Sequence, residues 1–190
     1  MSEMFEKKRG QSNGIYTNGI YTNMILTRKV YLPFNTIGSN VKEIIEKNIV
    51  SNIEGKCDVD GFIKNNSCVV KTFSSGVIKG NNIVFDVVFE CMVCSPVEGM
   101  IIPCIVKSIT KAGVRAELNE DPSPIVVFIA RDHNNKNPVF NKLTVDEHIN
   151  IKVIGTRFEL NDKFISIIAN IHEGIRKKKP KITIQGEDFE

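Results

Sequence analysis

The sequence predicts an α+β unit followed by an all-β barrel, and three observations support this. Every second residue from Ile83 to Val93 is apolar, which gives the period of two that a strand with one apolar face shows. Residues 41–49 place apolar side chains on one stripe with helical spacing. After Pro96, strand-like segments follow one another with no clear helix among them. A helix-bearing part therefore precedes a part built from strands alone.

The first unit begins with a strand over residues 24–32, which Pro33 ends because proline cannot donate to a sheet ladder. A helix follows. Asn40 is its predicted N-cap, with Glu43 three residues on in the capping-box position, and the helix closes at Asn52.

Three further strands are expected, at residues 54–63, 68–78 and 83–94. Polar turns join them, which indicates antiparallel neighbours. The first unit, residues 24–95, is therefore a β-α-β-β-β domain with one helix on an antiparallel sheet.

The second unit, residues 96–172, contains five predicted strands, at residues 100–109, 114–118, 125–130, 149–156 and 164–171. The longest excursion, residues 132–147, separates the third strand from the fourth. This outline is typical of an OB-fold barrel.

The two ends of the chain differ from these units. Residues 13–17 are repeated at once as residues 18–22, and both copies begin with the turn dipeptide Asn-Gly. The pair would form a small hairpin or a flexible arm. Because residues 1–23 offer little apolar surface, we expect a flexible extension. Residues 173–190 form a charged tail.

Composition narrows the class of protein. Hydrophobic residues make up 42% of the chain and charged residues 25%, which are globular values. No apolar run approaches the ~20 residues that a membrane helix needs, and the charged N-terminus does not resemble a secretory signal. A net charge of +3 is too mild for electrostatic binding of duplex DNA. We expect an intracellular protein whose five cysteines are reduced.

Cys91 and Cys94 have the spacing of half a zinc site, but they lie on a predicted strand. Residues three apart on a strand point to opposite faces, so packing is expected rather than a metal or redox site. Metal and cofactor are both predicted to be absent. No nucleotide-binding loop, serine-nucleophile or zinc-protease motif occurs, so no catalytic activity is expected.

Four segments carry a resemblance to one family. They are Asn-Ile-Glu-Gly-Lys-Cys at 52–57 followed by Gly-Phe-Ile at 61–63, Pro-Val-Glu-Gly at 96–99, Phe-Ile-Ala-Arg-Asp-His at 128–133, and Ile-Lys-Val-Ile-Gly-Thr-Arg at 151–157 followed by Asn161, Asp162 and Phe164. In this order and spacing they resemble the seventh subunit of RNA polymerase II and the archaeal counterpart of that subunit. The likeness runs from Met24 to about Ile171.

The resemblance implies a non-catalytic stalk subunit of a DNA-dependent RNA polymerase. The first unit would be the tip domain that docks on the polymerase core, and the OB domain would contact single-stranded nascent RNA. A fourth-subunit-like stalk partner is implied as well. The alternative is a free-standing OB-fold RNA-binding protein that acts in translation or RNA decay.

The chain departs from the family at several places. Residues 1–23 and 176–190 are additions, and residues 114–116 lack the aromatic side chains that many RNA-binding members carry after the first barrel hairpin. RNA binding is therefore expected to be weak. Heavy use of Asn, Ile and Lys fits an A+T-rich coding sequence. A large DNA virus is the favoured source, which implies virion and host cytoplasm. An A+T-rich protist is the alternative, which implies a nucleus.

Two sets of site residues are predicted. The candidates for RNA contact are Lys107, Lys111, Arg115, Phe128, Arg131 and His133. The cations among them are equally compatible with a solvated hairpin. The candidates for the polymerase interface are Phe34, Ile37, Gly61 and Phe62, with core packing as the competing interpretation.

Overall fold

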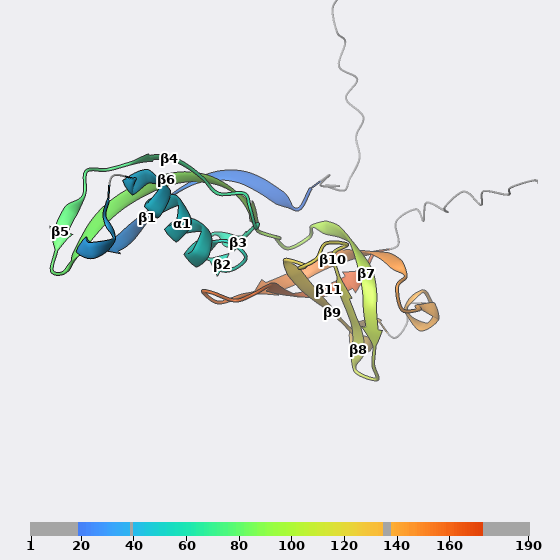
Figure 1. Ribbon diagram of the computed structural model, residues 1–190. Helices are drawn as coiled ribbons and strands as arrows, with labels where there is room; N and C mark the ends of the chain where they lie inside the picture. Colours follow the sequence, from blue (N-terminus) through green and yellow to red (C-terminus); the bar gives the residue numbers. More distant parts are fainter. Residues whose placement is uncertain (1–18, 39, 135–137, 173–190) are drawn as a thin grey trace, which may run out of the picture.

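The structure is a computed structural model that describes residues 19–38, 40–134 and 138–172. It contains a curved antiparallel sheet carrying one long helix, and a separate closed five-stranded barrel (Figure 1). The prediction of an antiparallel sheet and of a five-stranded barrel is confirmed. The charged tail, residues 173–190, and most of the predicted arm, residues 1–18, lie outside the described residues.

Two long strands form the frame of the sheet. β1 (Tyr21–Pro33) and β6 (Asn82–Cys94) are antiparallel and pair along the full length of both. β1 begins three residues before the predicted start, so residues 21–23 belong to the sheet and not to a flexible arm. The early start has a tertiary cause, because Tyr21 pairs with Cys94 and its hydroxyl donates a hydrogen bond to Glu120 of the barrel.

The helix α1 (Val41–Ile53) covers the concave face of this sheet (Figure 1). Its predicted apolar stripe faces the sheet, where Ile45 and Ile49 are fully buried. Burial of such a side chain stabilises the fold by about 1.5–3 kcal/mol. Asn40 is the N-cap, but its side chain does not cap the helix and donates instead to the Glu43 carboxylate at 3.4 Å.

The remaining strands of the sheet differ from the prediction. Residues 54–63 form a tight hairpin of β2 (Cys57–Asp58) and β3 (Gly61–Ile63) instead of one strand. Residues 68–78 form two strands, β4 (Val69–Phe73) and β5 (Val77–Lys79), which both pair with β6. Short polar and glycine-containing stretches break both segments. A short 3-10 turn, η1 (Phe34–Thr36), follows β1.

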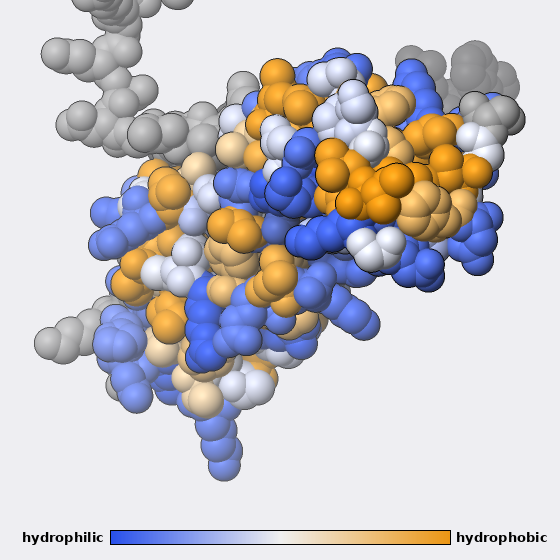
Figure 2. Space-filling view, turned by 90° about the vertical axis from the view of Figure 1, so that its left-hand side faces the viewer, coloured by the Kyte–Doolittle hydropathy of each residue, from blue (hydrophilic) through white to orange (hydrophobic). Residues whose placement is uncertain are grey.

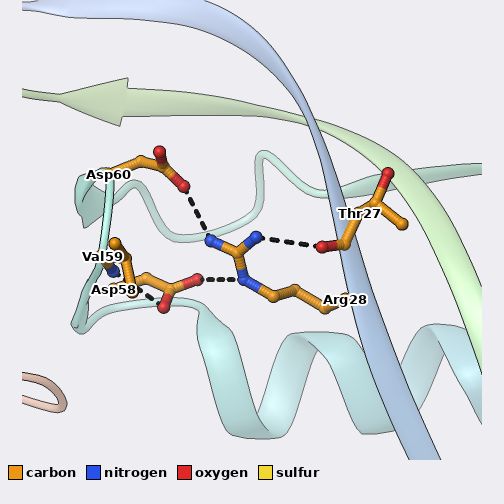
Figure 3. Close-up of polar contacts among 5 residues, drawn as sticks. All are labelled: Thr27, Arg28, Asp58, Val59 and Asp60. Atoms are coloured by element: carbon orange, nitrogen blue, oxygen red, sulfur yellow. Dashed lines mark hydrogen bonds and ion pairs between the residues drawn. The ribbon is translucent and has the colours of Figure 1, made fainter.

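Arg28 fastens the β2–β3 hairpin beneath the sheet (Figure 3). Its Nε donates to Asp58 at 2.8 Å and its Nη2 to Asp60 at 2.7 Å. A third donor, Nη1, binds the carbonyl of Thr27 at 2.9 Å. Partial burial lowers the pKa of the guanidinium, but the hydrogen bonds to Asp60 and Asp58 outweigh this and raise it. This cluster, the Arg28 clamp, is a structural ion pair.

The barrel closes in the strand order β7-β8-β9-β11-β10, with β9 and β11 parallel and the other pairs antiparallel. Its strands are β7 (Ile101–Ile109), β8 (Gly113–Glu117), β9 (Ile125–Ala130), β10 (His148–Arg157) and β11 (Ile165–Ile171). These bounds lie within one residue of the predicted ones, and the barrel is OB-like. The polar stretch after β9 is not free of helix, because it contains α2 (Arg131–Asn134) and a 3-10 turn, η2 (Phe140–Lys142).

The sheet and the barrel share a buried junction. Phe62, Cys57 and Cys94 of the sheet pack into the same hydrophobic cluster as the barrel interior. Cys57 also exchanges two backbone hydrogen bonds of 2.8 Å with the β10–β11 loop, donating to Asp162 and accepting from Asn161. The two bodies are therefore joined by core packing and by backbone pairing, and not by the linker alone.

Within the part of the chain that the structure describes, no helix has both the length and the apolar character required to cross a bilayer.

Candidate nucleic-acid interface

The predicted RNA-contact residues all lie on the barrel, but the structure brings only some of them together. Arg115 on β8 is the direct cross-strand neighbour of Phe128 on β9. Lys111 lies in the β7–β8 turn beside Arg131, at the start of α2. Lys107 lies at an irregularity of β7, between Val106 and Ser108, and is exposed. His133 is exposed on α2.

An apolar platform lies on the outer surface of the barrel beside Arg115. Phe128 is 41% exposed and pairs across the strands with Ile168 of β11, which is 54% exposed. We call the row Arg115, Phe128 and Ile168 the barrel face. A flat apolar surface next to a guanidinium offers stacking and phosphate contact together, which are the two contacts that single-stranded nucleic acid uses.

Sequence reasoning missed Ile168. It lies on a strand whose inward residues, Ile165 and Ile167, are fully buried, so the alternation alone assigns residue 168 to the outer surface. An isoleucine at an outward position was the available signal.

Arg131, one of the predicted RNA-contact residues, makes several contacts within the barrel unit. Its Nε donates to the carbonyl of Lys111 at 2.9 Å and its Nη2 to that of Thr110 at 3.2 Å. Its guanidinium also lies over the Phe140 ring, 5.3 Å from the centroid. These contacts tie the β7–β8 turn to α2, so Arg131 supports the turn that presents Lys111.

Acidic groups limit the positive charge of this surface. Arg115 forms an ion pair of 2.8 Å with Glu117, two residues along the same strand. Glu120 is engaged in contacts with the sheet. It accepts from the Tyr21 hydroxyl at 3.0 Å, and Lys64 lies 3.9 Å away. Phosphate binding at Arg115 therefore has to compete with one carboxylate.

The loops at the barrel rim are not equally available. OB folds bind ligands with the second and third strands and with the loops after the first and fourth strands. Here the loop after the fourth strand, residues 158–164, is bonded to Cys57 of the sheet. The β7–β8 turn with Lys111 is exposed. The barrel face and the turn with Lys111 are therefore the accessible part of this surface.

A second surface concerns the predicted polymerase contacts, and here the structure corrects two residues. Phe62 is only 2% exposed because it packs against the barrel interior. Gly61 is buried as well, and a Cβ there would lie 2.4 Å from the carbonyl oxygen of Cys94. Both belong to the junction and not to a free surface. Ile37 is partly buried against the sheet core, whereas Phe34 is exposed.

Exposed apolar side chains gather at the end of the sheet farthest from the barrel (Figure 2). Tyr31 and Val77 lie in one cross-strand row on the convex face with Val84 between them. Ile78, the next residue of β5, lies opposite Ile83 and points to the other face of the sheet. We call the exposed apolar side chains on the two faces of this end, Tyr31, Phe34, Val77 and Ile78, the distal patch; each is at least 44% exposed. Clustered exposed apolar residues mark sites of protein interaction.

The cysteines lie where the strand argument placed them. Cys91 faces the core between sheet and helix, while Cys94 belongs to the junction cluster. Burial raises the pKa of the Cys94 and Cys104 thiols to about 12 and that of Cys57 to about 11. These three thiols are therefore protonated and unreactive at neutral pH. Among the described residues, no group of three or more His, Cys, Asp or Glu is arranged to hold a metal ion.

Comparison with known proteins shows a similarity to a viral protein. The chain is 24% identical over 156 residues to a protein of Acanthamoeba polyphaga mimivirus named "Putative DNA-directed RNA polymerase subunit L376". The match covers 74% of this chain and 75% of the mimivirus protein. Neither the sheet nor the barrel alone accounts for that share, so the similarity includes parts of both. No model of a protein family matches the chain.

Proposed function

We propose that this chain is a non-catalytic subunit of a DNA-dependent RNA polymerase, of the class to which the seventh subunit of RNA polymerase II and its archaeal counterpart belong. The observation that carries the proposal is the similarity to the mimivirus protein, because it covers three quarters of both chains. An OB-like barrel that shares a hydrophobic cluster with a helix-bearing sheet agrees with the sequence resemblance.

The distal patch is the surface that we assign to the polymerase core. It is apolar and exposed, and it lies at the end of the sheet opposite the barrel. Phe34 is retained from the sequence prediction, and Tyr31, Val77 and Ile78 take the place of Gly61 and Phe62.

The barrel face is the surface that we assign to nascent RNA. Phe128 and Ile168 would stack on bases, while Arg115, Lys107 and Lys111 would contact phosphates. One aromatic residue and one partly neutralised arginine make this a weak site. A stalk partner of the fourth-subunit kind completes the proposal. The compartment follows the polymerase: virion and host cytoplasm for a virus, nucleus for a cellular source.

Affinity purification tests the polymerase association. The tagged chain should co-purify the large polymerase subunits from cells that contain its own transcription machinery. Ile78→Asp should abolish this co-purification, because it places a charge in the distal patch. Ile25→Asp is the matched control, since Ile25 is equally exposed, at 69%, but lies in the middle of the sheet. Recovery of the chain alone or with ribosomes would instead support a free-standing RNA-binding protein.

Salt-dependent RNA binding tests the barrel face. Replacing Lys107, Lys111 and Arg115 together by alanine should reduce the salt slope of single-stranded RNA binding by about 2, at ~0.7 for each phosphate contact. Replacement of three exposed lysines elsewhere, Lys42, Lys47 and Lys79, is the control of equal charge and should leave the slope unchanged. Equal slopes for the two triple variants would remove the barrel face as the RNA site.

A single aromatic substitution tests stacking. Phe128→Ala should weaken RNA binding roughly 5- to 150-fold, corresponding to about 1–3 kcal/mol per stacked base. Phe164→Ala is the control, because Phe164 is similarly exposed, at 39%, but is the last residue of the loop that is bonded to the sheet.

A further inference from the structure

Two cysteines face each other across neighbouring strands of the sheet. Val69 lies opposite Glu90 and Val70 opposite Phe89 in the pairing of β4 with β6. One step further along this register, Cys68 lies opposite Cys91. Cys91 is fully buried in the core beneath the sheet, and the half-buried Cys68 packs against the same core.

The hydrogen-bond pattern shows which kind of cross-strand pair they form. The N–H of Met92 donates to Ser67 Oγ, and its carbonyl accepts from Lys64, so the polar backbone groups of residue 92 point toward the β4 side. Those of Cys91 therefore point the other way, toward β1. Cys68 and Cys91 are thus a non-hydrogen-bonded pair, whose Cα atoms stand about 4.5 Å apart in regular sheet. A disulfide accepts Cα separations of about 4.4–6.8 Å.

The thiols of this pair also interact. A hydrogen bond with Cys68 lowers the pKa of Cys91, against the effect of burial, and the positive charge of Arg28 lowers it further. The same hydrogen bond, together with burial and the charge of Glu54, raises the pKa of Cys68. Cys91 therefore has more thiolate character than the other buried cysteines, whose pKa values are raised.

We propose that Cys68 and Cys91 are a site of reversible oxidation and form a disulfide by exchange with a low-molecular-weight disulfide such as oxidised glutathione. Cys68, which solvent reaches, loses its proton and attacks the glutathione disulfide as a thiolate, which forms a mixed disulfide and releases one glutathione that takes up this proton. The Cys91 thiolate then attacks the Cys68 sulfur and releases the second glutathione. The two thiol protons end on the two glutathione molecules, and the protein pair is oxidised by two electrons.

The disulfide would hold the point where three elements meet. Cys68 follows a turn that is hydrogen-bonded to Glu54 at the end of α1. The Glu54 carboxylate accepts hydrogen bonds from the N–H groups of Asn66, Ser67 and Cys68 at 2.8, 3.1 and 2.8 Å. A bond from Cys68 to Cys91 therefore links the end of α1 and the start of β4 to β6. The oxidised chain should melt roughly 5–10 °C higher than the reduced chain.

Mass spectrometry of the full chain tests the proposal. After equilibration with oxidised glutathione, the chain should weigh about 2 Da less than the reduced chain, the two hydrogens of one disulfide. A thiol-blocking reagent added to the unfolded chain should then label three of the five cysteines. Without reduction, trypsin should release residues 65–71 linked to residues 80–107. Reduced glutathione should reverse both changes.

Matched variants identify the partner. Cys91→Ala should abolish the linked peptide, and Cys94→Ala, three residues away on the other face of the strand, should preserve it. Cys94 cannot take over, because it is opposite Phe62 and not opposite Cys68. A chain that stays fully reduced, a glutathione adduct on Cys68 that never resolves, or a linked peptide that survives in Cys91→Ala would each overturn the proposal. None of these outcomes depends on the polymerase or on RNA.

Discussion

The barrel and the sheet differ in how they satisfy their backbone hydrogen bonds and in how they bury their apolar faces. The barrel closes on itself, so each of its five strands has two neighbours and its interior is filled by its own side chains. The sheet has α1 on one face only, and β1 pairs with β6 alone among the described strands. Its convex face carries exposed apolar residues such as Ile25 and Val77. A closed barrel is complete by geometry, whereas an open sheet leaves surface for other proteins.

The junction is where the two architectures depend on each other. Phe62 is contributed by the sheet but is buried in the barrel cluster, so the barrel seals one end of the sheet. Among the described residues, no comparable cluster covers the opposite end. This asymmetry explains why the apolar patch is distal, and three substitutions test it.

Phe62→Ala should have the largest effect. It removes a fully buried ring at the junction and should lower the free energy of unfolding by about 3–5 kcal/mol. Urea unfolding followed by far-ultraviolet circular dichroism measures this loss. Because the junction cluster is continuous, a single transition should shift as a whole.

Phe34→Ala is the matched control, because Phe34 is an exposed member of the distal patch. We expect a change within about 0.5 kcal/mol. Equal losses for the two variants, or a barrel transition that stays in place in Phe62→Ala, would contradict the dependence of the two bodies on each other.

Arg28→Leu should have an intermediate effect, because it removes the clamp within the sheet and leaves the junction intact. Loss of two charge-assisted hydrogen bonds, with Asp58 and Asp60 left close together, should cost about 2 kcal/mol. Differential scanning calorimetry measures it. Lys29→Leu is the control, since Lys29 lies on the exposed face of β1 and forms an ion pair with Asp86 of β6. A similar loss of stability in this variant would mean that the clamp contributes no more than a surface ion pair.

Tyr21→Phe should have the smallest effect, about 1 kcal/mol at pH 8, because it removes one neutral donor to Glu120. Burial and this hydrogen bond raise the pKa of the Tyr21 phenol above its usual value near 10. The folded chain therefore keeps a proton that the unfolded chain releases above pH 10. The resulting stability is complete below pH 10 and is lost as the pH rises toward the folded pKa. Urea unfolding should be measured at pH 8 and again above pH 10. The difference in urea midpoint between wild type and variant should be smaller above pH 10 than at pH 8. A difference that does not change with pH would place Tyr21 in contact with solvent.

Local patterns predicted much of this architecture. The five barrel strands and the α1 stripe follow from periodicity and from the turn residues between them, which are local signals. The two segments predicted as single strands, residues 54–63 and 68–78, contain turn residues that indicate a break. The Asp-Val-Asp-Gly turn separates β2 from β3, and Ser74-Ser75-Gly76 separates β4 from β5.

Other features have no local signal. Nothing near Phe62 in the sequence states that it is buried against a barrel that begins nearly forty residues later. The same holds for Asn134, a buried amide on α2 that donates to the Ala130 carbonyl and to Asn170. At the candidate site, the pairing of Arg115 with Phe128 follows from correct strand prediction, but Ile168 enters only through the parallel β9–β11 contact. Contacts between residues far apart in the sequence were therefore the part of the structure that local patterns did not predict.

The pairing of β1 with β6 has a mechanical consequence. The two strands form an unbroken ribbon that begins beside the distal patch, where Pro33 meets Asn82, and ends at the barrel, where Tyr21 meets Cys94. Bending such a ribbon strains many hydrogen bonds at once. A displacement of one end is therefore transmitted along the ribbon to the other end.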